Sequence, residues 1–263
     1  SGDTVIETAK LRKIEKEVSE PMMRTYLDRN LHIWKDYKPE GSYLLTADVA
    51  RGDGADYSVF HVLETKNMEQ VAEYQGKIDL DSFAKLIAMT ARDYGNCLVC
   101  VENNNIGYSV LTKLIETGYP NIFYSTKTID MTQESVVNYT EGTIPGFATT
   151  MKTRPLIVAK FDEYIRNDAL KINSKRLFRE LETFIWHNGK PQAAKNRNDD
   201  LIMAMAIGCW IRDTAIIQNQ REIESNRAIL GIMTSTNKQL NTSIGGMLYY
   251  ERQTKQEAAK EDY

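Results

Sequence analysis

The sequence lacks several signals that would point directly to a function. Of its 263 residues only three are cysteine, and two of these, Cys97 and Cys100, fall within the strand-like run 96–102. Residues three apart on a strand point to opposite faces, so this Cys-x-x-Cys pair is not expected to hold zinc or form a disulfide. Nothing resembles a signal peptide or a membrane-spanning run, and a reducing cytoplasm is the expected environment.

Excess positive charge and phosphate-binding loops are also missing. The net charge of −3 gives no overall basic signature for nucleic acid, although a local basic face would suffice for binding it. No Gly-x-x-x-x-Gly-Lys-Ser/Thr motif occurs, which excludes a P-loop ATPase within this chain. The apolar content is sufficient for a packed core, and the length allows one large domain or two small ones.

Hydrophobic periodicity predicts an α/β fold. Three alternating segments in succession predict an antiparallel meander, at 43–49, 57–64 and 69–75. A helix capped by Asp79 or Asp81 follows, and then the apolar run 97–102, which is typical of a central strand covered on both faces. We therefore expect a mixed central sheet, an antiparallel meander followed by parallel strands, with helices on both faces.

The rest of the chain predicts mostly helices. The expected helices lie near 12–18 and at 106–116, 152–165, 175–183 and 201–212, the last apolar nearly all round and so buried. Short strands are expected at 122–125 and 170–172, and Asn188-Gly189 predicts a hairpin within 184–193. The segment 126–150 has no clear period and is expected to be a long loop. The polar stretch after Asp213 is expected to be a tail.

The first strand ends in a carboxylate. Asp48 follows the apolar run that begins at Tyr43, and a turn with Gly52 and a second acid, Asp56, comes next. Burying a carboxylate costs several kcal/mol unless a hydrogen-bonded cap, a salt bridge or a bound cation compensates for it. Asp48 is therefore a candidate metal ligand.

Two further acidic positions occur at the ends of predicted elements. Glu102 ends the fourth strand, and Asp199 and Asp200 open the last helix. If the first and fourth strands are neighbours, Asp48 and Glu102 meet at one edge, and the last helix can deliver Asp200 to the same place. Converging carboxylates repel each other and need cations, and an all-oxygen site suits Mg²⁺ or Mn²⁺. Two such ions about 4 Å apart can hydrolyse a phosphodiester bond.

Each acid also has a plain structural interpretation. Asp48 could be a turn residue, and Glu102 could cap the Asn-rich turn that follows it. Asp199 and Asp200 are the residues that a helix N-terminus prefers through capping and the helix dipole. The order of the acids along the chain favours the metal site, because the structural interpretation requires three coincidences.

Three stretches carry a resemblance to a known family. They are Leu31-His-Ile-Trp-Lys-Asp-Tyr-Lys-Pro39, the segment Thr46–Tyr57 and Asn198-Asp-Asp-Leu-Ile-Met-Ala-Met205. Together with Val101-Glu-Asn-Asn104, they resemble the nuclease domain of the large terminase subunit of contractile-tailed, double-stranded DNA phages, within the ribonuclease-H-like superfamily. The resemblance covers about residues 2–211.

The resemblance implies site residues and a cofactor. The catalytic, metal-binding acids of the family fall on Asp48, Glu102 and Asp200, its additional loop acid on Asp56 and its loop glycine on Gly52, with Asp199 as a further candidate ligand. The implied cofactor is Mg²⁺ or Mn²⁺, as two ions. Some relatives carry a histidine where this chain has Asp79-Leu80-Asp81, so no histidine role is carried over.

The resemblance also implies a setting in the host bacterial cytoplasm, transiently at the portal vertex of the capsid. The expected partners are double-stranded DNA, the portal protein ring, the small terminase subunit and an N-terminal ATPase motor of the same protein, with no membrane. Residues 1–40 would be a connector from that motor, 41–213 the nuclease domain and 214–263 a C-terminal tail. The enzyme would cut concatemeric DNA when packaging begins and ends.

Basic residues in the second half of the chain could contact DNA. The candidates for a phosphate-binding rim are Lys152, Arg154, Lys175, Arg176, Arg179, Lys190, Lys195 and Arg197. Such contacts give affinity without sequence preference. The alternatives are an actin-like nucleotide-binding domain, which would need a second Gly-rich phosphate loop that the sequence lacks, a docking module for a motor, and a resolvase or transposase of the same superfamily.

Overall fold

A computed structural model describes residues 3–50, 56–104, 106–126 and 143–213. Three sequence predictions fall outside these ranges: the loop glycine Gly52, most of the long loop 126–150, and the tail 214–263. None of the helices in the described ranges is long and apolar enough to span a membrane.

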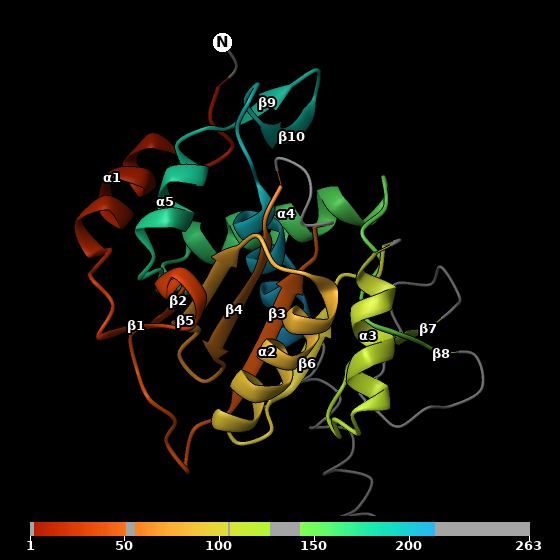
Figure 1. Cartoon of the computed structure of the whole chain (residues 1–263). Coiled ribbons are helices and arrows are strands. Elements are labelled where there is room, and N and C mark those ends of the chain that lie inside the picture. The colour runs from red at the N-terminus through yellow and green to blue at the C-terminus, as the bar shows by residue number, and fades with distance from the viewer. Residues whose placement is uncertain (1–2, 51–55, 105, 127–142, 214–263) are drawn as a thin grey trace, which may run out of the picture. The chain divides into compact units, whose positions relative to one another are not determined.

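A six-stranded mixed sheet forms the centre of the fold (Figure 1). The three central antiparallel strands are the predicted meander, and β3 also pairs with β6 in parallel, so both predictions are confirmed. In spatial order the strands are β1 (Met23–Thr25), β2 (Leu31–Ile33), β5 (Glu69–Gly76), β4 (Ser58–Glu64), β3 (Tyr43–Asp48) and β6 (Leu98–Val101).

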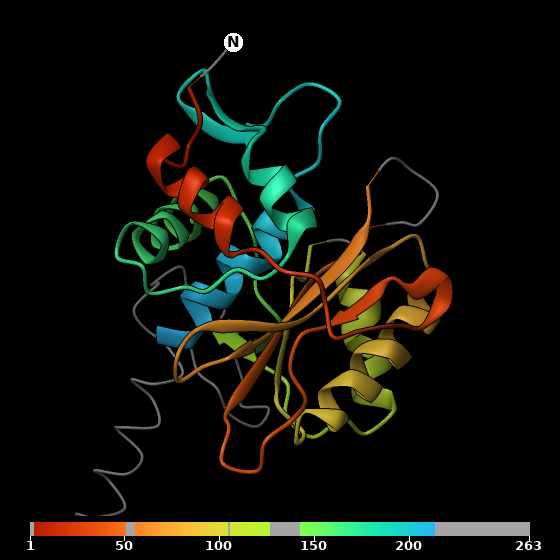
Figure 2. The same cartoon turned by 90° about the vertical axis from the view of Figure 1, so that its left-hand side faces the viewer.

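Helices cover both faces of the sheet, as predicted (Figure 2). The core on one face includes residues of α2 (Leu80–Asp93) and α3 (Gly107–Glu116). The core on the other face includes residues of α1 (Thr8–Glu17), α4 (Thr153–Arg166), α5 (Lys175–Leu181) and the helical segment 200–213, here called the final helix. Cys97 and Cys100 lie in opposite cores, so their side chains point to opposite faces of the sheet.

The smaller elements correct parts of the sequence prediction. The strand expected at 122–125 is β7 (Tyr124–Thr126), and it pairs with β8 (Thr143–Pro145), which lies inside the segment predicted to be a loop. The strand expected at 170–172 is a single bridge at Lys171. The hairpin prediction is confirmed as β9 (Phe184–His187) and β10 (Lys190–Ala193), with Asn188 and Gly189 at positive φ in the turn.

Residues before position 40 contribute to the same sheet and core. The strand β2 pairs with β5, and β1 pairs with β2 at the edge, with the 3₁₀ turn Leu27–Arg29 between them. Helix α1 begins four residues earlier than predicted and buries only Leu11 and Ile14. With so few apolar positions, the helical period in this stretch was too weak to define its start.

The final helix packs very closely against the sheet. A methyl group at Gly208 would lie 2.6 Å from Leu63 Cδ1 and 3.1 Å from Thr46 Oγ1, so a larger residue would require the Leu63 side chain to move. Leu63 is on β4 and Thr46 is on β3, two residues before Asp48. The close packing therefore fixes the helix over the strand that ends in the first candidate ligand.

Candidate active site

Asp48 and Glu102 lie side by side at the ends of two parallel strands. Asp48 is the last residue of β3, and Glu102 follows β6 directly. Ala47 pairs with Val101, and the Glu102 amide donates to the Ala47 carbonyl at 2.9 Å. The two carboxyl groups lie close enough to interact directly. The sequence prediction that these acids meet at one edge of the sheet is thus confirmed.

This contact perturbs the ionisation of Asp48. Burial raises the pKa of Asp48 well above its usual range, and the charges of Glu102 and Asp200 raise it further. Burial and the neighbouring carboxyl group thus disfavour the charged form of Asp48, and a cation beside it would compensate for that.

Asp200 approaches the pair from the final helix. Its Oδ2 accepts hydrogen bonds from the Tyr57 amide at 3.0 Å and from Asn198 Nδ2 at 3.1 Å. Burial raises the pKa of Asp200, those two hydrogen bonds oppose the rise, and the charges of Asp56 and Asp199 add to it. Asp56 is exposed and adjoins Tyr57 in the chain.

Asp199 is bound in a different way. Its Oδ2 accepts from the Arg154 guanidinium and from the Ala193 amide at 3.3 Å. The carboxylate therefore joins α4 and β10 to the start of the final helix. Asp199, predicted to bind metal, and Arg154, predicted to contact DNA, thus form an ion pair with each other. Both functional roles remain predictions.

Helix capping does not explain the Asp199-Asp200 pair. Within the described part of the chain, neither carboxylate accepts a hydrogen bond from an amide of the final helix. Glu180 of α5 does so instead: its Oε2 accepts from the Ile202 amide, and its Oε1 accepts from Gln75 Nε2, both at 3.2 Å. The capping role is thus excluded for Asp199 and Asp200, because Glu180 caps the final helix instead.

Glu180 is itself an unusual acid that sequence reasoning missed. It is 8% exposed, and burial raises its pKa to about 9, with added repulsion from Asp200. A neutral Glu180 can cap the helix without adding a charge beside Asp200. No local sequence pattern indicates this role, because Glu180 and Ile202 are on different elements.

Asn104 orients Glu102 and was also missed as a functional residue. Its Nδ2 donates to Glu102 Oε1 at 3.1 Å and to the Thr149 carbonyl at 2.7 Å. The neighbouring Asn103 donates to the Pro145 carbonyl at 3.0 Å. The Asn-rich turn after β6 therefore fixes one oxygen of Glu102 and ties it to the segment 145–149.

A buried polar network supports the first turn of the final helix. His61 Nε2 lies 2.9 Å from the Leu201 carbonyl and must donate to it, so His61 Nδ1 is the acceptor for Gln70 Nε2 at 2.9 Å. Gln70 Nε2 also donates to Glu73 Oε2 at 2.9 Å. Burial lowers the pKa of His61, which keeps the ring neutral. The network fixes the main chain directly after Asp200.

The predicted DNA-binding residues fall into two groups. Arg154, Lys175 and Arg176 form ion pairs with Asp199, Glu20 and Glu73 respectively. The others are exposed and have no ion pair with a described residue: Lys152, Arg179, Lys190, Lys195 and Arg197. One cation near the site was not predicted. Lys77 is exposed and lies 5.9 Å from the ring centre of Tyr57, whose amide donates to Asp200.

The residues present fit a hard divalent cation. Asp48 and Glu102 offer adjacent carboxylate oxygens, the ligands that such a cation prefers. Asp200 adds negative charge from the final helix. As placed, the described residues contain no group of three acidic, histidine or cysteine side chains that could together hold a metal ion, so the pair Asp48–Glu102 is the core of the candidate site.

The sheet order and the position of these acids define a ribonuclease-H-like α/β fold. Among solved structures, the large terminase nuclease of thermophilic phage G20c with bound magnesium is similar, with a TM-score of 0.58 and 15% identity over 76% of this chain and 95% of that one. The Thermus phage P74-26 large terminase nuclease domain is similar with a TM-score of 0.55 and 17% identity, over 75% and 92%. This chain therefore has the fold of large terminase nuclease domains. No protein-family model and no curated protein matches the sequence.

Replacing Asp48 by Asn should leave the fold intact and, in chelator at neutral pH, leave the melting temperature unchanged or higher. A raised native pKa means that the ionised acid costs stability above its unfolded pKa of about 3.9, and Asn removes that cost. Thermal unfolding of Asp48→Asn beside the exposed control Asp93→Asn measures this. A large drop for Asp48→Asn alone would make Asp48 a structural cap.

Replacing Glu180 by Gln should flatten the pH dependence of stability. A pKa raised to about 9 means that stability is full below about pH 4.5 and falls as pH rises toward 9. The slope is at most about 1.4 kcal/mol per pH unit. Urea unfolding in chelator from pH 5 to 9, with Glu182→Gln as the exposed neighbouring control, measures the difference. Equal slopes for wild type and Glu180→Gln would show that Glu180 is ionised.

Proposed function

We propose that this chain is the nuclease domain of a phage large terminase and that it cuts double-stranded DNA by metal-dependent hydrolysis. The observation that carries the proposal is the pair Asp48–Glu102, brought together at the ends of adjacent parallel strands. The fold it shares with terminase nucleases supports the proposal. The G20c nuclease has been solved with bound magnesium, cobalt and zinc, which supports a divalent cation here.

The metal site proposed here has Asp48, Glu102 and Asp200 as its ligands, with Asp56 beside it. Bound there, Mg²⁺ or Mn²⁺, as two ions, would activate a water and stabilise the leaving 3′ oxygen. Asn104 keeps one oxygen of Glu102 in place, and the Tyr57 amide does the same for Asp200. Such outer contacts fix the orientation of the ligands.

Contacts to the DNA backbone come from exposed cations around the site. Lys152 lies at the start of α4, Lys190 lies in the hairpin, and Lys195 and Arg197 follow the hairpin. Asp199 joins these elements to the final helix through its bonds to Arg154 and the Ala193 amide. Phosphate contacts of this kind hold any sequence equally. Lys77, beside Tyr57, is a further cation within the same region.

The wider role follows from the terminase assignment. The full protein would carry an N-terminal ATPase motor before residue 1, with residues 1–40 nearest to it and 214–263 as a tail. The nuclease would cut concatemeric DNA at the start and end of packaging, in the host cytoplasm and at the capsid portal vertex. Its partners would be the portal ring and the small terminase subunit.

The purified chain should nick and linearise supercoiled plasmid in Mg²⁺ or Mn²⁺ and should be inactive in chelator. Glu102→Ala and Asp200→Ala should each abolish cutting, and the double variant should be little worse than either, because groups that act as one unit are non-additive. Agarose-gel assays of plasmid conversion measure this, with Asp200→Asn as the isosteric variant and Asp93→Asn as the control.

Cutting that persists in chelator would contradict the metal mechanism. Near-normal cutting by either single variant would remove that residue from the site. Melting temperatures of the same preparations distinguish a lost site from a lost fold.

A further inference from the structure

A basic pocket lies on the flank of the sheet at β2. It is a cavity of about 210 Å³ between β2, the start of α5 and the segment 19–24. Its aromatic wall is His32 and Trp34, whose rings are 6.0 Å apart at 75°. Its cationic side chains are Arg24, Lys175, Arg176 and Arg179.

The positive charge of this basic pocket is only partly compensated. Glu20 is the one carboxylate among the described residues that line it, and it binds both Arg24 and Lys175. Arg176 donates from Nε to the buried Glu73 at 2.7 Å. Arg179 is exposed and has no ion pair with a described residue. Four cations thus face two carboxylates.

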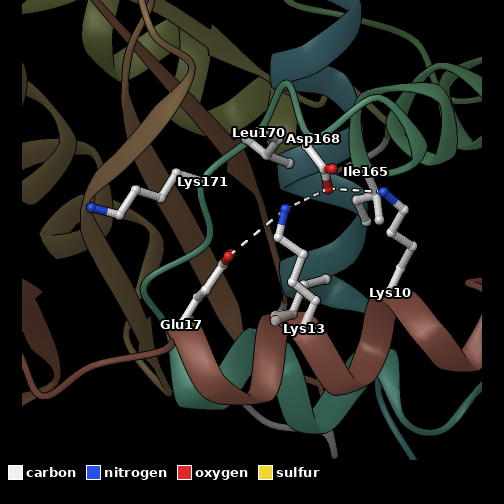
Figure 3. A pocket seen from close by; sticks show the side chains of 8 residues that line it. Lys10, Lys13, Glu17, Ile165, Asp168, Leu170 and Lys171 are labelled. Carbon is white, nitrogen blue, oxygen red and sulfur yellow. Dashed lines mark hydrogen bonds and ion pairs between the residues drawn. The ribbon is translucent and has the colours of Figure 1, made fainter.

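A second, larger pocket provides a comparison, because the positive charges of its side chains are balanced by carboxylates (Figure 3). Its volume is about 370 Å³, and it lies between α1 and the chain after α4. Lys10 and Lys13 both bind Asp168 at 2.9 Å, and Lys171 binds Glu69 at 2.9 Å. Each of its lysines already has a carboxylate partner, so this pocket has no unpaired cation for a ligand.

We propose that the basic pocket is a binding site for a phosphate group, distinct from the candidate active site, and that the backbone of bound DNA supplies that phosphate. The DNA source rests on the proposed nuclease function, whereas the phosphate site does not. Guanidinium groups present a planar fork of donors that matches phosphate oxygens, and three arginines line this cavity.

The basic pocket and the candidate active site border the same face of the sheet, and α5 and the final helix cover the part of that face between them. His32 pairs with Glu73, Glu73 with His61 and His61 with Thr46, so these side chains share one face of the sheet, the face of Asp48. Three strand spacings and two residues along β3 separate His32 from Asp48, which is roughly 16 Å. That distance corresponds to about five base pairs of duplex.

The test has two arms, both in chelator so that no DNA is cut. In the first, inorganic phosphate is titrated while the Trp34 indole N–H signal is followed by NMR, because Trp34 lines the pocket. In the second, a fluorescent DNA duplex is titrated at several salt concentrations. Each arm compares wild type with Arg179→Ala, Glu20→Gln and Lys85→Ala, an exposed lysine on α2 that serves as the matched control.

Arg179→Ala should weaken the binding of phosphate and of DNA about tenfold, and it should reduce the slope of log affinity against log salt concentration for DNA by about one. Glu20→Gln should strengthen the binding of both ligands, because it releases Arg24 and Lys175 from their competing carboxylate. A purely structural role for Glu20 would not improve binding. Lys85→Ala should change neither.

If the variants change phosphate binding but not DNA binding, the pocket binds a free phosphate. That result would overturn the proposal that DNA supplies the phosphate. If phosphate does not perturb Trp34, or if Arg179→Ala weakens binding no more than Lys85→Ala, the site is overturned. Plasmid cutting is measured separately, so failure of the nuclease function leaves the phosphate arm unaffected.

Discussion

The repulsion between two carboxyl groups at the ends of adjacent parallel strands governs the arrangement of this molecule. Asp48 and Glu102 are brought together by the pairing of β3 with β6, and the charge of Glu102 adds to the burial that raises the pKa of Asp48. The proposed cation would compensate for this repulsion.

In the proposed metal site, the surrounding polar groups would leave Asp200 available to the cation. Asp200 opens a helix whose first turn would ordinarily use the aspartates as caps, but Glu180 caps it from α5. The neutral His61 ring holds the Leu201 carbonyl, and Gly208 allows the helix to lie against β3. The position of Asp200 is thus set by contacts from three other elements.

Periodicity was enough to predict the meander, the central strand within 97–102 and the buried final helix, because each depends on a local pattern of apolar residues. That this central strand lies beside β3 was only assumed, because strand pairing is not local. Periodicity did not reveal β8 or the strand β2 beside the edge strand, which are three residues each and are held by their pairing partners. Within the site, the acids of the strand ends could be found from their positions. The cap by Glu180 could not, because it depends on contacts between distant segments.

The most direct test of a cation between Asp48 and Glu102 is the number of protons released when Mn²⁺ binds. Calorimetric titration at pH 7 in buffers of different ionisation enthalpy measures that number, since a ligand must be deprotonated before it binds metal. The raised pKa of Asp48 predicts that Mn²⁺ binding releases protons from wild type and fewer from Asp48→Asn. Binding without proton release, or equal release from both proteins, would contradict the account.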